Sequence, residues 1–128
     1  MKKIISLFAF MAASAFAQTA DVTAFIAPLS SQNEVPPVDL AANGTAVVWV
    51  HAMRDSSGAI VSGSVDFIAH YNFPAPVTFT GMHIHNGAAG VNAGVVINTG
   101  IGAGAASVAS DPSGRGVLIR PASLVPGE

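Results

Sequence analysis

Two histidines separated by one residue, His83 and His85, are the part of this sequence best suited to chemistry. Residues two apart in a β-strand point to the same face, so both imidazoles would project side by side. Imidazole nitrogens are common ligands of Cu²⁺ and Zn²⁺ in proteins. The spacing therefore makes His83 and His85 candidate metal ligands, with copper or zinc as the ion they would hold.

A closed metal site needs a third ligand from elsewhere in the chain. His51 and His70 are the candidates for it, and Asp66 or Glu34 could add a carboxylate oxygen. The alternative is that each imidazole forms a hydrogen bond with the backbone or with the Asn86-Gly87 turn, because an H-x-H pair is common by chance. The sequence leaves both interpretations open.

Other catalytic arrangements are poorly represented. The chain has no G-x-S-x-G motif, and its two glutamates, Glu34 and Glu128, are far apart in loop-like segments. The glycine-rich segment 100–105 imitates a dinucleotide-binding fingerprint, but no helical periodicity follows it. We therefore expect a protein that is not an enzyme and requires no cofactor.

The first 17 residues have the features of a secretory signal peptide. Lys2 and Lys3 form a basic start, residues 4–13 are apolar, and Ala15-Phe16-Ala17 fits a cleavage site. The apolar run is too short for a membrane-spanning helix. We expect cleavage after Ala17 and a secreted or periplasmic protein.

The remaining residues, 18–128, are expected to form one domain. Three arginines face seven acidic residues there, a formal charge of −4, which argues against binding nucleic acid or an anionic membrane surface. The chain has no cysteine, which excludes disulfides, thiolate metal sites and a cysteine nucleophile. The partner would be an unidentified protein or a small ligand.

Short apolar or alternating segments separated by Gly, Pro, Asn and Ser indicate an all-β fold. No segment shows a convincing helical period, so the pattern favours an antiparallel sandwich or barrel. The predicted strands are 21–29, 45–52, 60–71, 77–85, 95–98 and 116–120. The expected core includes Val48, Val50, Phe67, Phe79 and Ile84.

Three local features accompany these strands. Asn43-Gly44 is typical of a turn, and it also begins the glycosylation sequon Asn43-Gly44-Thr45. Residues 54–58 are expected to form a second turn, which makes the next strand antiparallel. Segment 45–52 is apolar on both faces, which predicts an inner strand covered on both sides. Trp49 within it is expected in the core rather than at an interface.

Two motifs together resemble the CHRD domain, a module named after chordin and also found in small exported bacterial proteins. They are Asn33-Glu34-Val35-Pro36-Pro37-Val38 and the segment His83-Ile84-His85-Asn86-Gly87-Ala88-Ala89-Gly90-Val91-Asn92-Ala93-Gly94-Val95-Val96, about 50 residues later. The resemblance implies an immunoglobulin-like, Greek-key β-sandwich with no established enzymatic activity. A binding or structural module is the function that it favours.

The resemblance also bears on the end of the chain. CHRD domains usually continue past the position of Arg120 into a strand-rich tail, whereas this sequence stops at Glu128. We therefore expect a C-terminally truncated sandwich whose open sheet edge could support self-association. The His-Ile-His strand is similar to the copper-binding strand of Cu/Zn superoxide dismutases, and a metal-binding or redox protein is the alternative function.

Overall fold

The computed structural model describes residues 17–88 and 90–124, which form antiparallel β-sheets. The all-β prediction is confirmed. The signal peptide predicted for residues 1–17 lies, except for Ala17, outside the described residues. No helix among the described residues is long and apolar enough to cross a membrane.

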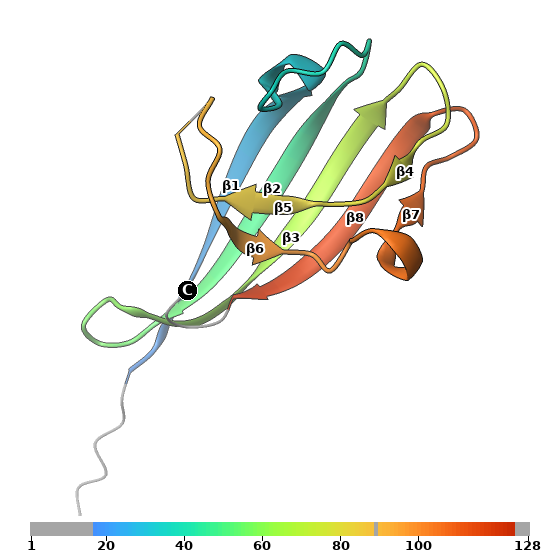
Figure 1. The fold of residues 1–128 in the computed structure, drawn as a ribbon. Coiled ribbons are helices and arrows are strands. Elements are labelled where there is room, and N and C mark those ends of the chain that lie inside the picture. Colours follow the sequence, from blue (N-terminus) through green and yellow to red (C-terminus); the bar gives the residue numbers. More distant parts are fainter. Residues whose placement is uncertain (1–16, 89, 125–128) are drawn as a thin grey trace, which may run out of the picture.

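The larger layer is a four-stranded sheet in the order β1-β2-β3-β8 (Figure 1). All three neighbouring pairs are antiparallel. The turn between β2 and β3 is the one predicted at residues 54–58, where the Gly58 N–H donates to the Asp55 carbonyl at 3.0 Å. The four strands are β1 (Thr19–Ser30), β2 (Asn43–Arg54), β3 (Ile60–Asn72) and β8 (Arg115–Leu124).

The second layer consists of two small antiparallel sheets. Strands β4 (Thr78–Phe79) and β7 (Val108–Ala109) form one, and β5 (His83–His85) and β6 (Val95–Asn98) form the other. Both lie in front of the large sheet in Figure 1. We call the face that they cover the inner face and the opposite face of the β1-β2-β3-β8 sheet the outer face.

Alternation along β3 and β8 creates the core on the inner face. Val65, Phe67 and Ala69 of β3 and Leu118 and Ala122 of β8 are buried. The second layer closes over them with Met82, Ile84, Ile97, Phe79, Ile101 and Val108. The predicted core is confirmed, since Phe67 is buried and Val48, Val50, Phe79 and Ile84 pack against the buried residues.

Segment 77–85 was expected to be one strand, and this prediction is wrong. The segment divides at residues 80–82 into β4, which pairs with β7, and β5, which pairs with β6. Phe79 packs on the core, and Met82 and Ile84 do so further along, so the inward positions change from odd to even numbers. The irregular segment between the two strands causes this change.

Asn43-Gly44 is part of β2 rather than a turn. Both residues pair with β1 on one side and with β3 on the other. A Cβ on Gly44 would collide with the His70 carbonyl oxygen, so glycine is required here by a close approach between strands.

The connection from β1 to β2 contains the first motif and is held by its own polar groups. It begins with a short 3-10 helix, η1 (Ser31–Asn33), capped by the Ser30 hydroxyl, which accepts from the Gln32 N–H. The Gln32 amide donates to the Val38 carbonyl at 3.1 Å, closing the loop. A second 3-10 helix, η2 (Gly104–Ala106), precedes β7.

Candidate functional site

The β5–β6 hairpin places His83 and His85 on the surface of the second layer. Ile84 between them packs on the core, so the two imidazoles point away from the large sheet. Their ring centroids are 4.7 Å apart, with an angle of 68° between the ring planes. The structure therefore brings the two predicted metal ligands side by side on an exposed surface.

Each ring of the pair has a local neighbour that affects its position. The His85 Nδ1 lies 2.5 Å from the Ala93 carbonyl oxygen. A carbonyl only accepts, so Nδ1 carries the proton and Nε2 of the neutral ring keeps a free lone pair. The His83 ring lies close to Gly81, where a Cβ would stand 3.1 Å from the His83 Cε1. The alternative to metal binding was a hydrogen bond from each of the two imidazoles to the backbone or to the Asn86-Gly87 turn, and His85 forms such a bond to the backbone.

The histidines expected as a third ligand are elsewhere. His51 of β2 and His70 of β3 belong to the outer face, whereas β5 covers the inner face. The His51 Nε2 lies 3.0 Å from the Asp66 Oδ2, and both side chains are about half exposed. In residues 17–88 and 90–124, no group of three or more His, Cys, Asp or Glu side chains is placed to hold a metal ion.

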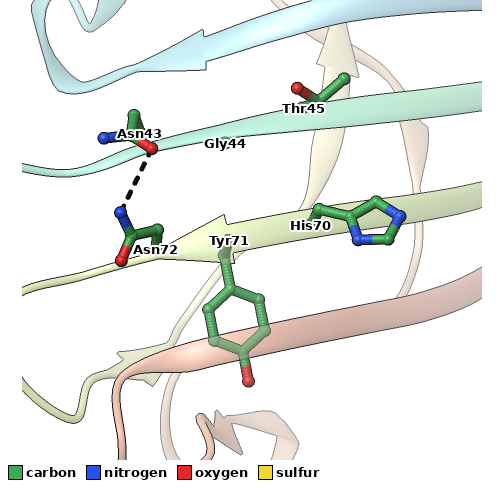
Figure 2. Close-up of a pocket in the computed structure, with 6 residues that line it drawn as sticks. All are labelled: Asn43, Gly44, Thr45, His70, Tyr71 and Asn72. Carbon is green, nitrogen blue, oxygen red and sulfur yellow. Dashed lines mark hydrogen bonds between the residues drawn. The ribbon is translucent and has the colours of Figure 1, made fainter.

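A shallow pocket of about 210 Å³ lies where β2 begins and β3 ends (Figure 2). The Asn72 amide donates to the Asn43 Oδ1 at 3.4 Å, and Thr45 pairs with His70 across the strands. Asn43, the first residue of the sequon, is exposed. About half of the lining surface is polar, and it offers amide, hydroxyl and imidazole groups to a ligand.

The outer face holds exposed apolar side chains that sequence reasoning missed as a group. Trp49 is 41% exposed here, so its assignment to the core is wrong, as is the coverage of β2 on both sides. β2 is indeed an inner strand of its sheet, between β1 and β3. The apolar residues that alternate along segments 21–29 and 116–120 were visible in the sequence. Which face of the sheet would be covered, however, depends on segments far away in the chain.

A comparison with models of protein families identifies the family to which this fold belongs. The model of the CHRD domain family matches residues 25–121. This range begins in β1, ends in β8 and includes both sequence motifs. No significant match was found among curated proteins or among solved structures.

Proposed function

The chain belongs to the CHRD domain family, and on this basis we propose that it is a non-enzymatic binding or structural module that acts in the periplasm or outside the cell. CHRD domains are in general non-enzymatic and typically extracellular. The features of residues 1–17 support export. The observation that carries the binding role is the open outer face, whose exposed apolar side chains suit an unidentified protein or small ligand.

Export is tested with the full chain expressed in a bacterial host. We expect the protein in the periplasm or medium, with Gln18 as its first residue by mass spectrometry of the intact chain. Ala15→Asp combined with Ala17→Asp should block cleavage, because the host's signal peptidase requires small residues at both positions. A wild-type chain that stays intact in the cytoplasm would contradict the proposal.

Metal binding at His83 and His85 is a second candidate, and the orientation of His85 favours it. The hydrogen bond to the Ala93 carbonyl fixes Nδ1 as the protonated atom, which is how metal-binding histidines are commonly oriented by their surroundings. Nε2 is then available for Cu²⁺ or Zn²⁺. Two protein ligands would leave the remaining positions to water or to a partner molecule.

Calorimetric titration of the metal-free protein with Cu²⁺ and with Zn²⁺ tests this candidate. We expect His83→Ala and His85→Ala each to weaken binding at least about tenfold. His70→Ala is the matched control, because it removes an exposed strand histidine from the outer face. Binding no tighter than about micromolar, or binding unchanged by His83→Ala, would rule the metal site out.

Self-association through an open sheet edge remains a prediction. β1 and β8 each have one edge without a neighbour among the described strands. Each carries a proline, Pro28 and Pro121, which has no N–H to offer an added strand. The prolines therefore interrupt the row of backbone groups that an added strand would pair with. For self-association, the two edges are poorer candidates than the broad outer face between them.

A further inference from the structure

The outer face is crossed by an unbroken apolar row. The register aligns Ile26 of β1 with Val47 of β2, Val47 with Ile68 of β3, and Ile68 with Ile119 of β8. The two ends of the row are the most open, with Ile26 74% and Ile119 60% exposed. Branched aliphatic side chains thus extend from one edge of the sheet to the other.

The neighbouring rows continue this apolar surface. One contains Ala24, Trp49 and Pro121, and the next in the other direction contains Pro28 and Val117. The two small sheets of the second layer pack on the inner face. None of the described elements packs over the outer face. We call the three rows together the outer patch.

Charge is sparse on the outer patch. Within its rows Asp66 is the ionisable acid, and its carboxylate is paired with His51 of the adjoining row at 3.0 Å. The row of Pro28 and Val117 adds the neutral Thr45 and the imidazole of His70. A strongly charged partner would find no complementary charges here, whereas another apolar surface would.

The size of this face suits a stable interface. Four strands about 4.8 Å apart and three residue rows about 6.8 Å apart span roughly 400 Å² of flat area, and the accessible surface of protruding side chains is larger. Stable complexes bury about 800 Å² on each partner. The patch would therefore form the apolar centre of such an interface, and the rows at its margins would supply the rest of the buried area.

We propose that the outer patch binds the outer patch of a second copy of this chain, forming a two-fold dimer. A two-fold axis between two such sheets brings the row from Ile26 to Ile119 against its own counterpart, so apolar meets apolar without any further partner. Twisted sheets pack face to face in this manner about 10 Å apart. This interface is separate from the free edges considered above.

Ile26→Lys and Ile119→Lys test the proposal by sedimentation velocity and light scattering on the full chain. We expect the wild-type chain to be a dimer. Either variant alone should raise the dissociation constant of the dimer at least about tenfold, because each would bury an unpaired charge in the interface. Both side chains are exposed in one copy, so folding should be preserved. Phe25→Lys is the control, being a 55% exposed neighbour of Ile26 on the inner face.

The placement of the two isoleucines on opposite edge strands separates face packing from edge pairing. A dimer paired through β1 would respond to Ile26→Lys and not to Ile119→Lys, and a dimer paired through β8 would do the reverse. Either single response would overturn the proposal. A wild-type chain that remains monomeric at about 100 µM would overturn it as well.

Trp49 supplies an independent readout, since it is the one tryptophan of the chain and lies in the patch. We expect its emission to shift to shorter wavelength as the wild-type concentration rises, and to stay constant in Ile119→Lys. A shift seen only on addition of neutral phosphatidylcholine vesicles to monomeric protein would show a lipid-binding face and would refute the second copy as its occupant.

Discussion

At the scale of single residues, two aspartates hold tight turns with their carboxylates. The Asp55 Oδ1 accepts from the Ser57 hydroxyl at 2.6 Å, from the Ser57 N–H at 2.8 Å and from the Ala59 N–H at 3.1 Å. Asp111 accepts in the same way from the hydroxyl and N–H of Ser113. These hydrogen bonds, the one from the serine hydroxyl foremost, hold the pKa of each carboxyl below its ordinary 3.8.

The lowered pKa of Asp55 predicts a defined response to acid. Stability from its ionised form is present above about pH 3.8 and is lost as the pH falls through the folded-state pKa. NMR titration of the carboxyl should give a pKa below 3.8 that rises in Ser57→Ala. Ser56→Ala is the control, because Ser57 and not Ser56 donates to this carboxyl. An Asp55 pKa unaffected by Ser57→Ala would contradict the assignment.

Residue environments were predictable where they depend on nearby sequence. The polar turn at residues 54–58 follows from its composition, and the shared face of His83 and His85 follows from their spacing in a strand. Trp49 was misplaced because its exposure depends on which face of the sheet the second layer covers. That layer comes from residues 78–109, far beyond the apolar strand in which Trp49 occurs.

At the scale of elements, the β2–β3 ladder depends on Gly44. A side chain at this position would meet the His70 carbonyl and approach the Tyr71 Cα to 3.4 Å. Gly44→Ala should therefore lower the free energy of unfolding by about 1–3 kcal/mol, through overpacking between strands. Urea unfolding followed by Trp49 fluorescence at one fixed protein concentration measures the loss.

Gly94→Ala is the matched control for the Gly44 substitution. A Cβ at position 94 would meet no heavy atom within 4 Å, and its backbone is not in the positive-φ region. We expect a change within about 0.5 kcal/mol there. Equal effects of the two substitutions would show that loss of glycine flexibility, and not contact with the β3 backbone, is responsible.

Strands were predictable in proportion to the regularity of their alternation. Segment 60–71 alternates clearly, interrupted by Ile60 and Ile68, and became β3, in which Val65, Phe67 and Ala69 are buried on one face. Segment 77–85 also fitted a period of two, but the fit was fortuitous, because residues 80–82 shift the alternation by one position. A period of two identifies which residues of a strand share a face. It does not reveal an irregular segment after which the other set of residues points to the core.

At the scale of the whole molecule, the two layers cover each other unequally. The four-stranded sheet is opposed by two pairs of short strands, and these lie over β2, β3 and β8 residues of the core. On β1 every residue from Thr19 to Leu29 is exposed, including Phe25 on the inner face. β1 is thus held mainly by its hydrogen bonds to β2. The family resemblance predicted a sandwich, and only the structure reveals which strand is left uncovered.

The pairing of β3 with β8 has a consequence for the order in which the chain acquires stability. Leu118 and Ala122 complete both groups of buried side chains, so the core cannot close before residues 115–122 are available. A chain that emerges from the ribosome or crosses a membrane with its N-terminus leading would carry β1, β2 and β3 as an unfinished sheet for most of its passage. The strand that completes the core is the last one described, so such a chain gains the stability of its core only after residues 115–122 have followed.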